Sequence, residues 1–341
     1  MPEVDLVFLT RALVDIDSTT GSESEAGCWL AEYLAGLGFT VTKQPVDAAR
    51  FNIIAQAGTT ATPSLVFSTH FDCVPPFFPS RVDGDRLSGR GACDAKGILA
   101  AQVAAADRLR RAGETRVGLV FVVGEERGSD GARKANEAAN GCRYLIDGEP
   151  TDNRLGQATR GILRLVLRAT GRAAHSSYPE LGVSAIDKLI DVLVSLRDIA
   201  LPVDPILGRT HYSVGLISGG VAPNVVSPSA EAEVMFRTVG EATEVRRALQ
   251  PLEDHVAIEH VIEVPPVRMA VVPGFQTAVF PYTTDIPFLA RWGEPLLFGP
   301  GSIHVAHTAD EYVSIAELSA AADHYVTLAR CLLESQDRSP Q

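Results

Sequence analysis

The sequence lacks the features that would place the chain in a membrane, on a nucleic acid or outside the cell. No run reaches about 18 uninterrupted apolar residues, so we expect no membrane-spanning helix. Acidic residues outnumber basic ones, 42 to 30, and the formal net charge of −12 argues against a nucleic-acid partner, which would need a basic face. The N-terminus lacks the basic start of a secretory signal, so we expect a cytoplasmic protein.

Cysteine is also scarce. The five cysteines are scattered and form no C-x-x-C pair, which is typical of reduced thiols rather than of a disulfide framework (Cys28, Cys73, Cys93, Cys142 and Cys331). Cys73 and Cys93 lie near candidate metal ligands, so thiolate coordination is one interpretation. Free cysteines more often pack as small apolar side chains, and we expect buried inert thiols at both positions.

The remaining composition is that of a globular protein. Of 341 residues, 46% are hydrophobic and 21% are charged, and we find neither a low-complexity tract nor a repeat. This length suits one large domain or two ordinary ones.

Acids and histidines follow the apolar runs of this sequence. The run 117–123 predicts a buried strand, and Glu125 and Glu126 come after it. Three further runs also lead into possible metal ligands: residues 64–69 into His70 and Asp72, residues 143–146 into Asp147 and Glu149, and residues 295–298 into His304 and His307. Because sites in open α/β sheets gather beyond the carboxyl ends of the strands, we predict a metal centre.

The chain is expected to fold as two domains, one of them discontinuous. Strand and helix patterns alternate up to about residue 157, which predicts an α/β domain with a central, mostly parallel sheet covered by helices on both faces. Residues 161–264 change to the order strand, helix, strand, strand, helix, strand, the split motif of an α+β ferredoxin-like unit. Candidate ligands lie on both sides of this stretch. We therefore expect a catalytic domain of residues 1–158 and 267–341, interrupted by an inserted domain at 159–266.

One helix of the first domain has clear end signals. A capping-box pattern from Ser22 to Glu25 predicts its start, and Gly38 predicts its C-terminal stop.

The candidate ligands are two imidazoles and three carboxylates: His70, Asp94, Glu126, Glu149 and His307. Five ligands are too many for one tetrahedral zinc ion with an open position, but they suit two zinc ions that share a carboxylate. Asp94 is the expected bridge because it lies on a glycine-rich turn, although it could instead cap the helix predicted at 98–111. Spacing alone leaves two choices open, between Glu149 and Asp147 and between His307 and His304.

Two neighbours of these ligands have predicted roles in catalysis. Asp72 is placed to accept the ring N–H of His70 and orient that ligand. Glu125 is the candidate general base for the attacking water. Mixed nitrogen and oxygen ligands accept several divalent ions, so cobalt or manganese could take the place of zinc.

Five motifs, read in order, resemble the family of acetylornithine deacetylase, succinyl-diaminopimelate desuccinylase and carboxypeptidase G, which are zinc hydrolases (residues 70–75, 89–97, 125–126, 148–151 and 307–312). The resemblance implies that one zinc ion is held by His70, Asp94 and Glu149. It implies that the other is held by Asp94, Glu126 and His307, with Glu125 as the base. Cys73 stands where that family usually has a small aliphatic residue, a departure we expect to be silent.

The inserted domain resembles the lid and dimerisation domain of the same family, through residues 174–179, 219–224 and 236–237. This resemblance implies a homodimer in which His175 reaches the partner's site and steadies the oxyanion, with Asn224 beside it. It also implies that Arg237 holds the substrate carboxylate, for which a guanidinium fork is well matched. An isolated Asn or Arg in such a domain could equally be a turn or surface residue.

The sequence therefore predicts a dinuclear zinc hydrolase that cleaves the amide bond of a small-molecule N-acyl amino acid. Residues 298–307 look more like the acetylornithine deacetylase side of the family. A dipeptidase or carboxypeptidase that uses the same metals is the first alternative, and a non-catalytic homologue that binds metal or amino-acid derivatives is the second. The sequence has no G-x-S-x-G elbow of a serine hydrolase, and residues 91–97 lack the spacing of a P-loop.

Overall fold

The computed structural model describes residues 3–58, 62–139 and 141–337. The chain forms two compact units. Unit 1 comprises Met1–Gln157, Arg268–Ala278 and Thr284–Gln341, and unit 2 comprises Ala158–Val267 and Val279–Thr283. Within the described ranges, no helix is both long enough and apolar enough to cross a membrane.

Unit 1 is built around a six-stranded sheet with the order β1-β2-β6-β3-β7-β17. Its strands are β1 (Thr40–Pro45), β2 (Phe51–Gln56), β3 (Leu65–His70), β6 (Val117–Val122), β7 (Tyr144–Asp147) and β17 (Glu294–Leu297). The last four run parallel, whereas β1 and β2 are antiparallel to their neighbours. Every residue of β3 and β6 is buried, as expected for parallel strands that are covered on both faces. The predicted α/β fold with a mostly parallel sheet is confirmed.

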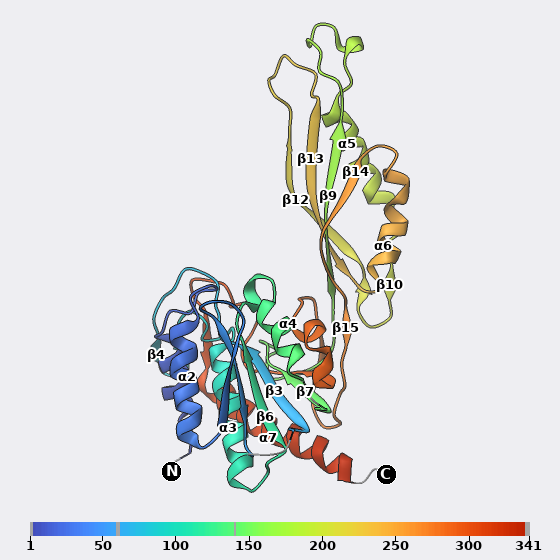
Figure 1. Ribbon diagram of the computed structural model, residues 1–341. Coiled ribbons are helices and arrows are strands. Elements are labelled where there is room, and N and C mark those ends of the chain that lie inside the picture. The colour runs from blue at the N-terminus through green and yellow to red at the C-terminus, as the bar shows by residue number, and fades with distance from the viewer. Residues whose placement is uncertain (1–2, 59–61, 140, 338–341) are drawn as a thin grey trace. The chain divides into compact units, whose positions relative to one another are not determined.

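Helices cover both faces of this sheet (Figure 1). Phe67, Leu119 and Phe121 face the larger core, which they share with four helices: α1 (Leu6–Val14), α2 (Ser24–Leu37), α3 (Lys96–Arg111) and α7 (Ile315–Asp337). Val120 and Val122, on the alternate positions of β6, face a smaller core with α4 (Asp130–Glu137). The two-residue period of a strand therefore divides the apolar run between two cores.

The two ends of α2 differ in how well they were predicted. Gly38 terminates the helix with a φ of 95°, in the left-handed conformation that glycine favours, as predicted. The predicted capping box is wrong, because the helix begins at Ser24 and its N-cap residue, Glu23, makes no capping hydrogen bond with its side chain. The Glu23 carboxylate instead accepts a hydrogen bond from the N–H of Gly21 and pairs with Arg50.

Unit 2 is a four-stranded antiparallel sheet with two helices on one face (Figure 1). Along the chain its main elements are β9 (Gly161–Thr170), α5 (Ala185–Ser195), β12 (His211–Gly219), β13 (Ser229–Thr238), α6 (Ala242–Leu249) and β14 (Ala257–Val264). The strand order is β12-β13-β9-β14, so β12 and β14 are the edge strands. Alternate residues of β9 and β13, such as Leu165 and Val234, form the core with α5 and α6.

Short strands complete the described structure. They are β4 (Arg81–Asp83), β5 (Arg86–Ser88) and β18 (Tyr312–Ser314) in one sheet; β10 (Val203–Asp204) and β11 (Gly208–Arg209) in a second; and β8 (Leu155–Thr159), β15 (Val267–Arg268) and β16 (Thr277–Phe280) in a third.

Candidate metal centre

Candidate ligands lie at the carboxyl ends of the parallel strands of unit 1. His70 is the last residue of β3, Glu126 lies in the short helical turn Glu125–Arg127 after β6, and Glu149 lies two residues beyond β7. β17 leads into the loop that contains His307. Because neighbouring parallel strands end at the same edge of the sheet, side chains from distant parts of the sequence meet there.

The first group of ligand atoms belongs to His70, Asp94 and Glu149. One atom from each side chain lies within 4.8 Å of the other two, and all three residues are buried. Nε2 of His70 is 3.0 Å from Oδ1 of Asp94. An imidazole nitrogen and two carboxylate oxygens at this spacing can hold one divalent cation.

The second group belongs to Asp94, Glu126 and His307, again with all ligand atoms within 4.8 Å of one another. Nε2 of His307 is 2.9 Å from Oε1 of Glu126 and 3.3 Å from Oδ2 of Asp94. The two oxygens of Asp94 thus face different histidines, His70 and His307. This arrangement lets one short carboxylate serve both groups.

The alternatives that spacing left open lie elsewhere in the structure. Asp147 is buried at the end of β7, and its Oδ2 atom has no hydrogen-bond partner in the described part of the chain, but its carboxylate belongs to neither group. His304 is exposed and also belongs to neither group. Cys73 and Cys93 are buried free thiols, and burial raises the pKa of Cys73 to about 11.

Asp72 joins several parts of the site. Nδ1 of His70 is 3.0 Å from the backbone oxygen of Asp72 and 3.5 Å from its carboxylate. That carboxylate accepts hydrogen bonds from the backbone N–H groups of Glu125 at 3.1 Å and Glu126 at 3.3 Å. It also accepts the hydroxyl of Thr20 at 2.8 Å. Asp72 therefore positions Glu125 and Glu126 as well as His70. Sequence reasoning had found only its role toward His70.

The electrostatics of these side chains fit bound cations. Burial raises the pKa of Glu149 and of Glu125 well above the usual value, and it also raises the pKa of Glu126. A divalent cation would stabilise the charged form of such carboxylates. The donor set, imidazole nitrogen and carboxylate oxygen, is one that zinc accepts. The residues present therefore fit two cations that share Asp94.

A further buried acid, Asp285, was missed by sequence reasoning. It lies in unit 1, and both of its carboxylate oxygens are buried without a hydrogen-bond partner among the residues that the structure describes. Burial raises its pKa to about 7, and its charge contributes to the raised pKa values of Glu125 and Asp147. No motif or periodic pattern marks this position, because it precedes only a short helical turn, Ile286–Phe288.

His175 and Asn224 lie side by side in unit 2. The segments that carry them are joined by a hydrogen bond from the N–H of Ser176 to the backbone oxygen of Asn224, at 2.9 Å. A β-bridge also pairs His175 with Val225. Nδ1 of His175 accepts a hydrogen bond from the N–H of Ser177, which leaves its Nε2 atom available as a donor.

Arg237 lies at the other end of the same sheet. β13 pairs with β9 from Ser229 opposite Thr170 to Arg237 opposite Ile162, and the His175 and Asn224 segments adjoin the Ser229 end. Eight residues of strand at about 3.3 Å each separate the two ends by about 26 Å. Within one copy of unit 2, Arg237 is therefore far from His175 and Asn224.

The surroundings of Arg237 are cationic. It lies opposite His211 on β12, and the Arg160 guanidinium bonds Nδ1 of His211. Burial, together with the charge of Arg160, lowers the pKa of Arg237. Across the described residues, no carboxylate pairs with the Arg237 guanidinium. Such a group is suited to bind an anion from outside the chain.

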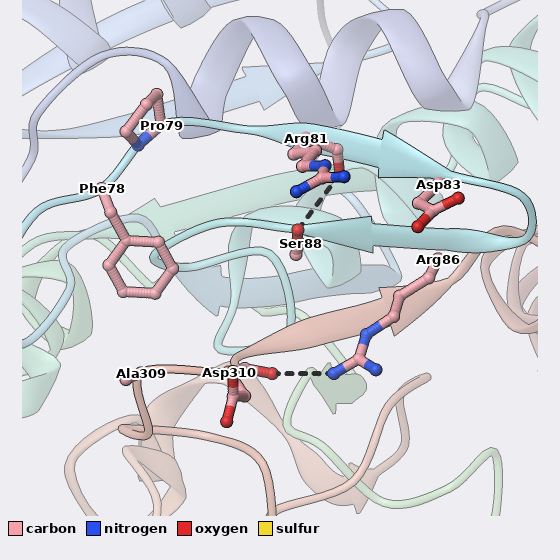
Figure 2. A pocket seen from close by; sticks show the side chains of 8 residues that line it. All are labelled: Phe78, Pro79, Arg81, Asp83, Arg86, Ser88, Ala309 and Asp310. Carbon is pink, nitrogen blue, oxygen red and sulfur yellow. Dashed lines mark hydrogen bonds between the residues drawn. The ribbon is translucent and has the colours of Figure 1, made fainter.

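A separate cavity of about 380 Å³ lies against the β4–β5 hairpin, as Figure 2 shows. It is lined by Phe78, Pro79, Arg81, Asp83, Arg86, Ser88, Ala309 and Asp310. Arg86 donates a hydrogen bond to the backbone oxygen of Asp310 at 3.2 Å and stacks over the ring of Tyr312. The cavity borders the His307 loop but contains none of the candidate ligands, so it is distinct from the candidate metal centre.

Sequence comparisons find relatives along nearly the whole chain. Residues 66–330 match the family model described as peptidase family M20/M25/M40. A probable carboxypeptidase of Aspergillus terreus is 42% identical over an aligned length of 369 residues, gaps included. The alignment covers 94% of this chain and 85% of the relative. A peptidase M20 domain-containing protein of Schizosaccharomyces pombe is 38% identical over 332 residues, which cover 94% of this chain and 83% of the relative.

Solved structures share the fold. A tripeptidase from Staphylococcus aureus superposes with a TM-score of 0.80 at 21% identity, over 96% of this chain and 100% of the other. A dinuclear metal-binding peptidase of the M20 family from Bacillus subtilis superposes with a TM-score of 0.75 at 18% identity, over 96% and 98%.

Proposed function

This chain belongs to the peptidase family M20/M25/M40 and is a hydrolase of amide bonds, and we propose that it cleaves the amide bond of an N-acyl amino acid using two zinc ions. The observation that carries the proposal is the meeting of two ligand groups at Asp94. In this proposal His70, Asp94 and Glu149 hold one ion, and Asp94, Glu126 and His307 hold the other. Cobalt or manganese could replace zinc at such ligands.

The reaction assigns distinct tasks to the protein's own side chains. When bound, the two cations supply Lewis-acid chemistry that activates water and polarises the scissile carbonyl. Glu125 takes a proton from the attacking water and passes it to the leaving amine nitrogen. The raised pKa of Glu125, caused mainly by burial, suits a group that must both accept and donate a proton. Asp72 holds Glu125 in place through its backbone N–H.

In this proposal, residues of unit 2 bind the substrate at two points, its carboxylate and the oxyanion. Arg237 binds the free carboxylate of the amino acid, a role supported by its cationic, half-buried surroundings. His175 donates a hydrogen bond to the oxyanion, with Asn224 beside it. Because Arg237 and His175 lie about 26 Å apart along one sheet, they cannot both reach one small substrate from the same copy. The proposal therefore requires a homodimer that exchanges His175 and Asn224 between subunits.

The exposed edge of unit 2 supports this homodimer. β12 pairs with β13 on one side only, and its side chains Leu216 and Ile217 are 63% and 65% exposed. Ile190 and Val194 of α5 are also exposed. An open strand edge with apolar neighbours is a surface on which a second copy can extend the sheet and bury apolar area.

A carboxypeptidase or dipeptidase is the second candidate function. Relatives that cover 94% of this chain or more are named probable carboxypeptidases, which favours peptides as substrates. The two candidates share one chemistry, because each substrate has an amide nitrogen that belongs to an amino acid with a free carboxylate. They differ only in the acyl group on the other side of the amide.

A metal-dependent hydrolysis assay tests the proposal. Protein stripped with chelator and reloaded with zinc or cobalt is offered N-acetyl amino acids including N-acetylornithine, N-succinyl-diaminopimelate, and simple dipeptides. We expect turnover only after reloading. In Glu125→Gln we expect kcat to fall by about 10²- to 10⁴-fold while two ions per chain remain bound.

Glu137→Gln is the matched control, because Glu137 is an exposed acid on α4 that pairs only with Lys134 among the described residues. It should keep parent activity. Turnover of dipeptides but not of N-acyl amino acids would select the peptidase. Two bound ions without turnover of any substrate would favour a non-catalytic binding protein, and an active Glu125→Gln variant would exclude Glu125 as the base.

A further inference from the structure

Glu311 is a fully buried acid whose carboxylate makes three hydrogen bonds. Its Oε2 atom accepts from Nη1 of Arg90 at 2.6 Å. Its Oε1 atom accepts from the backbone N–H groups of Cys93 and Asp94, both at 3.1 Å. We call these four groups the Glu311 clamp. Both partners of its ion pair are buried, with Glu311 0% and Arg90 3% exposed.

The Glu311 clamp joins two loops that are far apart in the sequence. Asp94 lies on the loop before α3, whereas Glu311 is four residues beyond His307 and directly precedes β18. The backbone oxygen of Glu311 also accepts the N–H of Gly89, at 3.1 Å. Tyr312 then pairs with Ser88 where β18 meets β5. The loop of Asp94 is therefore held, from Gly89 to Asp94, against Glu311 at the end of the His307 loop.

Arg90 anchors the clamp to a third segment. Its Nε atom donates to the backbone oxygen of Pro76 at 3.2 Å, and its guanidinium lies over the ring of Phe78 at 4.8 Å. An arginine held at three points cannot follow a displaced Glu311 without losing these contacts. The Glu311 clamp is thus a buried and fixed set of contacts rather than a flexible ion pair on the surface.

We propose that Glu311 is a positioning residue that sets the separation of Asp94 from His307 and thereby the affinity of the second ligand group for its cation. The two groups depend on the clamp unequally. The second group takes ligands from both clamped loops, Asp94 and His307, whereas the first takes only Asp94 from them. A loosened clamp should therefore weaken the second cation far more than the first.

The test is a titration of metal-free protein with cobalt. Binding is monitored by calorimetry and by the absorption spectrum of the bound cobalt. Glu311→Gln keeps an oxygen for the two N–H groups but loses the ion pair with Arg90. Arg90→Lys keeps the positive charge but not the fork that reaches three partners. In both variants we expect the affinity for the second ion to fall by about 10- to 100-fold, as is usual when a group that orients a ligand is changed, with the first ion bound as in the parent.

Asp107→Asn is the matched control for a general loss of stability. Asp107 is also a buried acid that pairs with two arginines, Arg110 and Arg111. It lies eleven residues along α3 from Lys96, about 16 Å from the clamped loop. Its substitution should lower the unfolding midpoint and leave both cobalt affinities unchanged.

The inference rests on the proposed two-metal function, and the titration separates the failure of one from that of the other. If the parent binds only one cobalt ion, the proposed function fails and the inference with it. If the parent binds two and both clamp variants keep the second affinity within about twofold, the inference alone is overturned. Equal losses in Asp107→Asn and Glu311→Gln would overturn it too, because the effect would then be one of stability.

Discussion

At the scale of single residues, the candidate centre concentrates carboxylates that burial makes costly to charge. Glu126 and Glu149 have raised pKa values because they are desolvated, and the pKa of His307 is also raised, in its case by its acidic neighbours, which favour the charged ring. Its hydrogen bonds to Asp94 and Glu126 raise the pKa of His307 to about 10. The metal-free site thus holds a proton on His307, one of the residues proposed to bind the second cation.

The first prediction concerns that proton. Because the pKa of His307 lies well above neutrality, its ring is protonated at pH 7, and a metal ion must displace the proton to reach Nε2. We expect affinity for the second ion to rise about tenfold per pH unit between roughly pH 6 and 8. Calorimetry in buffers of different ionisation enthalpy would measure the released proton. His304→Asn should keep this release and His307→Asn should lose it; equal release in both variants would contradict the assignment.

The second prediction concerns Arg237 and its cationic surroundings in unit 2. Arg237→Lys keeps the charge but loses the planar fork, so we expect kcat/KM to fall by about 10- to 100-fold for substrates with a free carboxylate. A substrate whose carboxylate is amidated should show no further loss. Arg168→Gln is the control, since Arg168 lies on the same sheet but pairs with Glu231 and Glu259. An equal loss on both substrates would contradict carboxylate binding by Arg237.

At the scale of elements, the ends of helices show how local chemistry and tertiary contacts compete. Gly38 ends α2 because its backbone needs a positive φ, and no distant contact is required. The start of the same helix is decided otherwise, since buried Glu23 binds Gly21 and Arg50 rather than capping the helix. A strong local signal at Ser22 was thus overridden by a long-range ion pair.

The third prediction uses two glycines of this helix that lie two residues apart. At Gly38, with φ of 95° and only ordinary contacts to Arg110, alanine should lower the free energy of unfolding by about 1–2 kcal/mol through backbone strain. At Gly36, inside the helix and with open space around it, alanine should raise the same free energy by about 0.5–1 kcal/mol. Denaturant unfolding of the two variants checks this opposition of sign, and the same sign in both would refute it.

At the scale of the whole molecule, the proposed site is complete only when two chains meet. The fourth prediction therefore concerns mixtures of inactive variants. His175→Ala and Glu125→Gln homodimers should each be nearly inactive. In mixed dimers one site regains both intact residues, so co-expression in equal amounts should restore roughly one quarter of parent activity. No restoration in verified mixed dimers would mean that His175 acts within its own chain.

The fifth prediction concerns the surface that we propose joins the two chains. A charge placed on the open β12 edge, as in Ile217→Lys, should convert the dimer to a monomer in light scattering and remove most of the activity. Val261→Lys is the control, because Val261 is 42% exposed on the opposite edge strand, β14. If Val261→Lys produced the monomer instead, the dimer would form through the other edge.

Much of this molecule could be predicted from sequence because its main elements are marked locally. The runs that became β3, β6 and β7 are mainly apolar since parallel strands are buried on both faces, and the candidate ligands come at or just after the ends of these runs. From this pattern, His70, Glu126 and Glu149 could be placed at one edge of a sheet. The α/β fold and the types of candidate ligand followed from the sequence by itself.

Only the tertiary structure decided how those side chains are arranged. Asp72 bonds the N–H of Glu125 across 53 residues, and Glu311 bonds Arg90 across 221. No local pattern encodes such contacts, because they depend on which loops the packed sheet brings together. The opposite positions of His175 and Arg237 are likewise a matter of strand register. Sequence therefore determined which chemistry the chain carries, and packing decided which groups share Asp94 and which are proposed to come from a second chain.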